Sequence, residues 1–378
     1  MINAAAGSST GDARLLAVAV ELGFITSTQV QDVLARQKQL KKGGIVLPVQ
    51  QLLLELDFIQ PPQLRTITDE VELRHAQAQA SSAVLTATST LRIGRYEILG
   101  VLSDNGYTRV LKAVNVENGT LAVLKALPTA ISHQSQWLER FRREMNLVAN
   151  LSHPNIIGVY ECGSAEGMAY IAFEYLKGMP LSVRLEREGN LPERIAWLVA
   201  REVARGLQFI EERGILHRDI KPDNILCGLD GRVKIIDLGL SKSLIDSNFI
   251  TAMGETVGTP FYMSPEQATG TRGLDHRTDI YALGCVTYHA LTGSVPFFAQ
   301  DAVEVMLKHN EAARPDPREI LPELNPDGSA LVRWMMARQP EDRPATCAQL
   351  VEAMTELLAR LPEPAGTRSV LKVVPSAP

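Results

Sequence analysis

One short segment constrains this chain more than any other. Ile215–Leu226 places six polar or charged residues between apolar flanks, and Pro222 prevents a helix from running through it. A loop that carries Asp219, Lys221 and Asn224 is suited to orient a hydroxyl, a phosphate and a metal ion together. The alternative is a solvated turn whose polar residues have no common task.

A second segment follows closely. Val233-Lys-Ile-Ile-Asp-Leu-Gly239 is typical of a buried strand that ends in an acid and a glycine. Asp237, at that strand end, can hold Mg²⁺, a hard cation that prefers oxygen ligands. Two unrelated solvated turns do not explain why so many residues suited to binding phosphate and metal occur at these spacings. We therefore expect the two segments to form one site.

The third feature is a lysine in an apolar strand. The alternation over Leu121–Leu127 places Lys125 on one face with apolar neighbours, where an unpaired ammonium loses its water at a cost. The helix predicted over Trp137–Leu151 carries Glu144 within its apolar stripe. The two charges can pair with each other, or each can reach solvent separately.

Together these segments resemble the eukaryotic-like, or Hanks-type, serine/threonine protein kinases of bacteria. His217–Asn224 resembles the catalytic loop in its serine/threonine form, and Asp237-Leu-Gly239 resembles the metal-binding motif, with Leu in place of the usual Phe. Ala122-Val-Leu-Lys125 resembles the motif that supplies the nucleotide-binding lysine, and Glu144 falls where its partner glutamate belongs. Gly258–Glu266 resembles the end of an activation segment.

The resemblance covers about Tyr96 to Leu361 and implies an α+β, two-lobed protein-kinase fold. The N-lobe would hold an antiparallel sheet and one helix, αC, and the C-lobe would be mainly helical. The predicted boundaries are a small helical domain over 1–75, a linker over 76–94, a kinase domain over 95–361 (N-lobe 95–176, C-lobe 177–361) and a flexible tail over 362–378.

The resemblance implies a reaction. In such a kinase the γ-phosphate of ATP passes to a serine or threonine hydroxyl of a protein, with Mg²⁺ bound. Asp219 would accept or steer the proton of the hydroxyl, and Lys221 would steady the transferring phosphoryl group. Asn224 and Asp237 would bind Mg²⁺. Positioning and charge stabilisation would supply most of the rate.

The resemblance also implies a nucleotide site. Lys125, held by Glu144, would grip the α- and β-phosphates of ATP. The adenine would lie against the hinge backbone and against apolar side chains, with Phe173 as the gatekeeper. The residues expected there are Leu102, Val110, Val123, Glu174 and Leu176.

The resemblance also implies residues that support the active site. Asp279 would anchor the catalytic loop from a helix below it, and Arg343 would pair with Glu266 of the activation segment. A phosphate on that segment would pair with Arg218 and order the loop. The candidate autophosphorylation sites are Thr251 and Thr256.

One motif departs from the family. The glycine-rich loop falls on Ser103–Val110, where the three glycine positions hold Ser103, Asn105 and Thr108. Glycine matters there because backbone N–H groups must approach the phosphates closely. A second departure is Val123, where the family usually has alanine over the adenine ring. We expect an active, autophosphorylating signalling kinase, with a pseudokinase scaffold of weak nucleotide affinity as the alternative.

The front of the chain carries a repeat. Glu21-Leu-Gly-Phe-Ile25 returns further along as Glu55-Leu-Asp-Phe-Ile59, which predicts a duplicated helix–turn–helix unit. Val20–Val30 is similar to the N-terminal domains of type II secretion and type IV pilus ATPases. Some relatives of those domains bind cyclic di-GMP, but neither copy here opens with Arg-Leu-Gly. We therefore favour a docking or dimerising module over a ligand sensor.

The composition is that of an ordinary soluble protein, with 45% hydrophobic and 21% charged residues. A net charge of −5 gives no basic field for nucleic acid, so the expected partners are ATP and a protein substrate. Four scattered cysteines show no zinc or redox spacing. We see neither a signal peptide nor the ~20 apolar residues that span a bilayer, and expect a cytoplasmic location.

Overall fold

The computed structural model describes residues 15–16, 18–20, 22, 24–42, 49–56, 58–59, 63, 67, 91–104, 108–127, 135–149, 151–237, 260–271, 273–299 and 301–363. The chain divides into two compact units, Met1–Leu91 and Arg92–Pro378. Each unit buries apolar side chains of its own.

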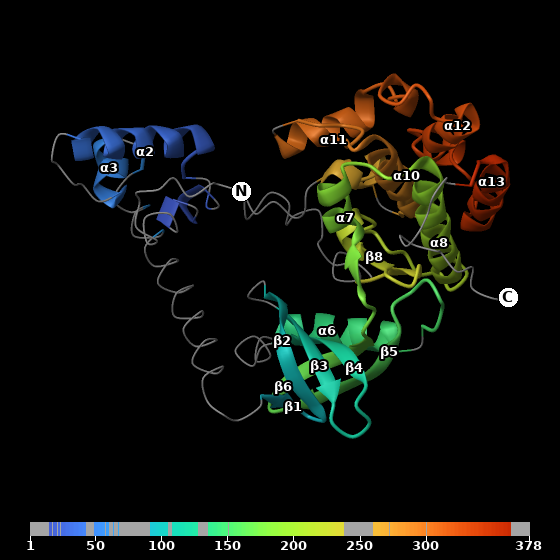
Figure 1. Cartoon of the computed structure of the whole chain (residues 1–378), viewed down its shortest axis with the longest axis horizontal. Helices are drawn as coiled ribbons and strands as arrows, with labels where there is room; N and C mark the ends of the chain where they lie inside the picture. The colour runs from blue at the N-terminus through green and yellow to red at the C-terminus, as the bar shows by residue number, and fades with distance from the viewer. Residues whose placement is uncertain are drawn as a thin grey trace. The chain divides into compact units, whose positions relative to one another are not determined.

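The first unit is helical where it is described (Figure 1). Its helices are α2 (Ser27–Lys42) and α3 (Val49–Glu55). Thr26 caps α2, because its N–H donates to Gln29 Oε1 at 2.8 Å and its hydroxyl accepts from the Gln29 N–H at 3.3 Å. The buried core of this unit consists of Leu15, Leu16, Val18, Ala19, Ile25, Val30, Val33, Val49, Leu52, Leu53, Ile59 and Ile67.

The two copies of the sequence repeat share one turn geometry. In the first copy, the N–H groups of Phe24 and Ile25 both donate to the Ala19 carbonyl, at 3.0 and 3.3 Å. In the second copy, the N–H groups of Phe58 and Ile59 both donate to the Leu53 carbonyl, at 3.0 and 3.4 Å. The repeat in the letters is therefore also a repeat in the backbone hydrogen bonds.

The second unit opens with an N-lobe built on an antiparallel sheet, in the strand order β1-β2-β3-β4-β6-β5. Its strands are β1 (Arg92–Ile93), β2 (Tyr96–Asp104), β3 (Arg109–Asn115), β4 (Leu121–Leu127), β5 (Val159–Ala165) and β6 (Met168–Glu174). Helix α6 (Ser135–Val148) packs against β6. Figure 1 shows α6 lying on one face of this sheet.

The sheet begins earlier than the sequence predicts. Arg92 and Ile93 pair with β2 as strand β1, so the predicted linker over 76–94 is wrong at its C-terminal end. Ile93 is 1% exposed and belongs to the same buried cluster as Tyr96 and Tyr170. A strand of two residues is too short to produce the alternation by which strands are recognised.

The alternation of β4 is the one predicted. Ala122, Leu124 and Ala126 are buried on one face of the sheet, in the cluster that also holds Leu111. The intervening Lys125 is half-buried and faces the other side. The sheet therefore keeps its purely apolar layer on one face and presents its lysine on the other.

The C-lobe is mainly helical and is formed around two long helices, α8 and α10, which pack together. Its helices are α7 (Leu181–Glu188), α8 (Glu193–Glu211), α9 (Pro265–Ala268), α10 (Arg277–Thr292), α11 (Ala302–Glu311), α12 (Pro326–Met335) and α13 (Cys347–Arg360). Short 3₁₀ turns occur at Pro222–Asn224, Pro260–Tyr262, Pro317–Glu319 and Pro340–Asp342. Almost every side chain of α10 is buried, which makes this helix the centre of the lobe.

A small sheet lies between the two lobes. It consists of β7 (Gly178–Pro180), β8 (Ile225–Gly228) and β9 (Val233–Ile235), in that order. All three residues of β9 are buried, and Val233 and Ile235 belong to the same apolar cluster as Phe141 of α6 and Ile280 of α10.

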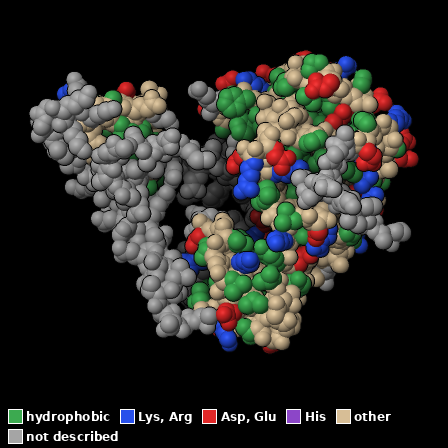
Figure 2. Space-filling view, viewed as in Figure 1, with side chains coloured by type: hydrophobic (Ala, Val, Ile, Leu, Met, Phe, Trp, Pro, Cys, Tyr) green, Lys and Arg blue, Asp and Glu red, His purple; other side chains and the backbone are tan. Residues whose placement is uncertain are grey.

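On the face of the second unit drawn in Figure 2, basic and acidic side chains are interspersed, and neither sign covers the surface. Among the described residues, no helix combines the length and the apolar character that crossing a bilayer requires.

Candidate active site

The site is centred on Asp237, which follows β9. The N–H of the preceding Ile236 donates to the Asn224 carbonyl at 2.9 Å, which joins this strand end to the 3₁₀ turn Pro222–Asn224. Asp237 has φ of 60°, in the left-handed region. Such a conformation costs a non-glycine residue about 1–3 kcal/mol and persists only where the surroundings hold it.

Lys125 joins the two lobes at this point. Its ammonium lies 2.7 Å from Glu144 Oε1, on α6, and 2.6 Å from Asp237 Oδ1. The side chains of Lys125 and Glu144 are 16% and 9% exposed, whereas that of Asp237 is 55% exposed. The predicted contact between Lys125 and Glu144 is therefore present, and it extends to a second carboxylate at the edge of the site.

The charges in this cluster shift one another's pKa values. Burial disfavours the charged lysine, but the carboxylates of Asp237 and Glu144 outweigh it and raise the pKa of Lys125. Burial raises the pKa of Glu144, against the opposing charge of Lys125. Lys125 therefore stays cationic near neutral pH, as phosphate binding requires.

The same face of the sheet carries the predicted apolar lining. Val110 lies opposite Lys125, and Val123 lies opposite Phe173, and directly opposed residues point to one face. Phe173 lines a small cavity together with Glu144 and Asp237. The remaining predicted lining residues are Glu174, at the end of β6, the buried Leu176 just after it, and Leu102 near the end of β2, which is 55% exposed.

The loop before β8 brings three polar side chains together. Pro222 opens the 3₁₀ turn Pro222–Asn224, where its missing N–H costs nothing. Asn224 Nδ2 donates to the Asp219 carbonyl at 2.7 Å and to Asp219 Oδ2 at 3.1 Å. Lys221 Nζ lies 3.2 Å from the same carboxylate oxygen. Asp219, Lys221 and Asn224 thus form one cluster, as expected for a shared task.

Asp279, on the central helix α10, anchors this loop from below. Its carboxylate accepts the backbone N–H groups of His217 at 2.8 Å and of Arg218 at 2.7 Å. Arg218 has φ of 64°, so the acid holds a strained turn directly before Asp219. Burial raises the pKa of Asp279 and lowers that of His217.

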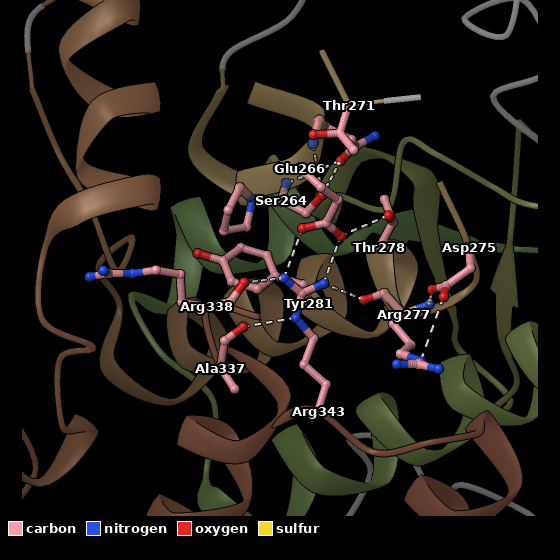
Figure 3. Close-up of polar contacts among 12 residues, drawn as sticks. Ser264, Glu266, Thr271, Asp275, Arg277, Thr278, Tyr281, Ala337, Arg338 and Arg343 are labelled. Atoms are coloured by element: carbon pink, nitrogen blue, oxygen red, sulfur yellow. Dashed lines mark hydrogen bonds and ion pairs between the residues drawn. The ribbon is translucent and has the colours of Figure 1, made fainter. Parts of the chain in front are cut away.

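A second predicted pair, Glu266 with Arg343, joins the start of α9 to the segment before α13 (Figure 3). Both guanidinium NH₂ groups of Arg343 donate to Glu266, Nη1 to Oε1 at 2.7 Å and Nη2 to Oε2 at 2.8 Å. Thr278 Oγ1 donates to the same carboxylate at 2.9 Å. The Arg343 side chain is fully buried, and it also donates to the carbonyls of Ala337, Arg277 and Arg338.

The donor set fits Mg²⁺. The side-chain amide N–H₂ of Asn224 is used on Asp219, so its oxygen is the group left to face a cation. Asp237 adds a carboxylate that is half in solvent. No group of three His, Cys, Asp or Glu side chains suited to a metal occurs among the described residues. Mg²⁺ typically takes only one or two protein carboxylates and completes its shell with phosphates and water.

Two predicted features fall outside the described residues. Thr251 and Thr256 lie in 238–259, and Asn105 of the altered glycine-rich loop lies in 105–107. Within the described part, β2 and β3 pair up to Asp104 and Arg109, with irregularities near Gly100 and Leu102. The strands that flank the loop are therefore paired as far as Asp104 and Arg109.

One contact was not foreseen from the sequence. Lys234, in the middle of β9, is 5% exposed, and its ammonium lies 2.5 Å from Glu174 Oε1. The available signal was a lysine inside an otherwise apolar strand, the same signal that identified Lys125.

Comparison with known proteins identifies the family of the second unit. The sequence model of the protein kinase domain family matches residues 96–354. A probable serine/threonine-protein kinase of Clostridium perfringens is 34% identical over 257 residues, 68% of this chain and 37% of that protein. Serine/threonine-protein kinase PknB of Mycobacterium leprae is 34% identical over 260 residues, 68% of this chain and 42% of PknB. The match thus spans less than half of either relative.

Solved structures agree on the fold. The crystal structure of the Mycobacterium tuberculosis PknI kinase domain is 24% identical, with a TM-score of 0.56 over 72% of this chain and 99% of that one. At this level of identity, the likeness shows the fold alone. The family model covers more than half of the 378 residues of this chain, and the chain therefore belongs to the protein kinase family.

Proposed function

We propose that the chain is a serine/threonine protein kinase of bacterial signalling that transfers the γ-phosphate of ATP to protein hydroxyls. One observation carries the proposal. The ammonium of Lys125 lies within 2.7 Å of carboxylates from both lobes, beside a loop whose Asp219, Lys221 and Asn224 are in mutual contact. The names of the relatives from Clostridium perfringens and Mycobacterium leprae support the serine/threonine class.

The residues divide the reaction among them. Asp219 takes or steers the hydroxyl proton of the protein substrate, because its carboxylate is a base that the Asn224 amide holds in position. Lys221, 3.2 Å from Asp219, neutralises charge on the transferred group. Lys125 binds the α- and β-phosphates, and Val110, Val123 and the hinge receive the adenine. The O–P bond to the hydroxyl forms as the γ-phosphate leaves ADP.

Asn224 and Asp237 would hold Mg²⁺. Bound there, the ion would neutralise phosphate charge and orient the β- and γ-phosphates. This chain's own residues fix the geometry, since Asn224 is oriented by Asp219 and Asp237 by Lys125.

The first prediction concerns phosphate transfer. The full-length protein is incubated with γ-labelled ATP and Mg²⁺, and the label on the chain is compared with that of Asp219→Asn. We expect wild type to label itself and the variant to fall by at least about a hundredfold, since general acid–base groups contribute ~10²–10⁴-fold. Mass spectrometry of the labelled chain locates the phosphates, which we propose lie on Thr251 and Thr256. Equal labelling of both proteins contradicts the role of Asp219.

A pseudokinase scaffold is the second candidate, and one observation favours it. Ser103 and Thr108 stand where the family has glycine, and a β-branched residue restricts the backbone that must approach phosphates. A wild type that binds Mg·ATP weakly and transfers no label supports this reading instead.

We further propose that the first unit is a duplicated helix–turn–helix module, related to the N-terminal domains of secretion and pilus ATPases, that docks a partner or dimerises. The sequence repeat and the matching turn hydrogen bonds support a duplication. The proposed domain boundaries are those predicted from the sequence, except that the kinase domain begins at Arg92 and not at residue 95.

A further inference from the structure

Lys234 is a buried cation without an assigned task. It occupies the centre of β9, with only 5% of the residue exposed. A buried ammonium needs partners, and it has two: Glu174 Oε1 at 2.5 Å and the Ile156 carbonyl at 3.1 Å. The glutamate lies at the hinge, at the end of β6, and β9 leads directly into Ile236 and Asp237.

The same glutamate binds a third segment. Glu174 Oε1 accepts the Gly158 N–H at 2.7 Å, and the Glu174 N–H donates to the Gly158 carbonyl at 2.8 Å. A Cβ added at Gly158 would lie 3.1 Å from the Glu174 carboxylate oxygen. An alanine there would therefore push the carboxylate back by a few tenths of an ångström.

The segment from Asn155 to Gly158 is in turn bonded to β9. Ile235 N–H donates to the Asn155 carbonyl at 2.8 Å, and Ile157 N–H donates to the Ile235 carbonyl at 2.9 Å. The hinge, this segment and β9 thus form one cross-linked cluster. Its charged centre is the pair Lys234–Glu174, which we call the hinge pin.

We propose that the hinge pin is a positioning device, which fixes the hinge backbone that receives adenine relative to β9 and the Asp237 that follows it. The inference rests on the proposed function of the site. Neither side chain touches the phosphates. Their proposed effect is on the distance between the hinge backbone, which receives adenine, and Asp237, at the phosphate end of the site.

The pin has a matched control on the same carboxylate. Arg232 Nη1 lies 3.8 Å from Glu174 Oε2, and its side chain is 49% exposed. Exposed pairs of this kind contribute little. Lys234→Met and Arg232→Met therefore remove one cation each from the same glutamate, one buried and one in solvent.

The experiment measures the Kd of Mg·ADP by calorimetry on the full chain, and the KM for ATP and kcat by label transfer. We expect Lys234→Met to raise Kd and KM at least about tenfold while kcat stays within about twofold, because saturating nucleotide restores the bound geometry. Arg232→Met should change Kd by less than about twofold. Gly158→Ala, which displaces the carboxylate without removing a charge, should weaken binding in the same direction as Lys234→Met.

A double variant guards against misfolding. Glu174→Met with Lys234→Met leaves no unpaired buried charge, and it should bind nucleotide no worse than Lys234→Met alone, since the two residues act as a unit. A lowered Tm with an unchanged Kd would mean that the pin only stabilises the fold, and would overturn the proposal. So would a lowered kcat with an unchanged KM. A wild type that binds no Mg·ADP would instead refute the proposed kinase function.

Discussion

At the scale of single residues, the cations of the site are already paired with carboxylates. Lys125 contacts Glu144 and Asp237, Lys221 contacts Asp219, and each contact is between 2.6 and 3.2 Å. On the proposed function, the phosphates of ATP would meet cations that are already held in position. Binding would then require little reorganisation of the protein.

Replacing Lys125 by Met tests this balance. The change leaves Glu144 buried at 9% exposure with no cation beside it, and breaking a buried pair costs roughly 3–5 kcal/mol. We expect a lower Tm and a loss of label transfer of at least about a hundredfold. Circular dichroism and the transfer assay measure the two effects.

The pH dependence of the Lys125→Met variant follows from Glu144. Burial already raises its pKa, and the loss of Lys125 raises the pKa further. A group whose folded pKa is raised destabilises the fold while it is charged, so the variant should recover stability as pH falls from 7 towards 5. Adding Glu144→Gln should remove this recovery; a double variant that behaves like the single one would contradict the assignment.

At the scale of elements, the segment around α9 is held by one clamp. Ser264 caps α9 through a capping box with Gln267, and Glu266 is fixed by Arg343 and Thr278. Burial alone would raise the pKa of Glu266, but the hydrogen bonds and charge of Arg343 outweigh it, and the pKa is lowered. The clamp therefore depends on an ionised carboxylate.

The contribution of ionised Glu266 to the stability of the fold should vanish in acid. Because the folded pKa lies below the ordinary value of about 4.5, the contribution is complete above that pH and is lost as pH falls through the folded pKa. Glu266→Gln should be destabilised at pH 7, and its deficit relative to wild type should shrink between pH 5 and 3. Thermal melts at each pH measure this, and a deficit independent of pH would contradict it.

The strands and the site residues could be predicted from the sequence wherever a local pattern of apolar and charged residues marks them. The strand β4 has the predicted bounds, and Lys125 and Glu144 were found because each is a charge within an apolar pattern. The hinge pin was missed because Glu174 and Lys234 lie far apart in the chain, on strands of two different sheets, and no periodicity relates them. Strand β1 was missed because two residues cannot show a period.

At the scale of the whole molecule, the chain joins a helical unit to a kinase unit. Among the described residues, the first unit has a buried core of its own, which includes Leu16, Val33 and Leu53. A protein lacking Met1 to Leu91 should therefore keep the fold and the intrinsic chemistry of the second unit.

We expect this truncated protein to melt within a few degrees of the kinase transition of the full chain and to bind Mg·ADP with a similar Kd. If the first unit dimerises the chain, self-labelling of the truncated protein should become dependent on protein concentration, whereas a monomeric docking module predicts the same rate law as the full chain. Light scattering of both proteins supplies the control. A truncated protein that fails to fold would refute the independence of the second unit.

The clamp between Glu266 and Arg343 also sets an order on synthesis. Arg343 comes long after its partner in the chain, near the end of the kinase unit. A nascent chain released before this arginine emerges from the ribosome holds the Glu266 carboxylate without its guanidinium, and the carbonyls of Ala337, Arg277 and Arg338 without their donor. Prematurely terminated products should thus be unable to form the contact that fixes Glu266 at the start of α9.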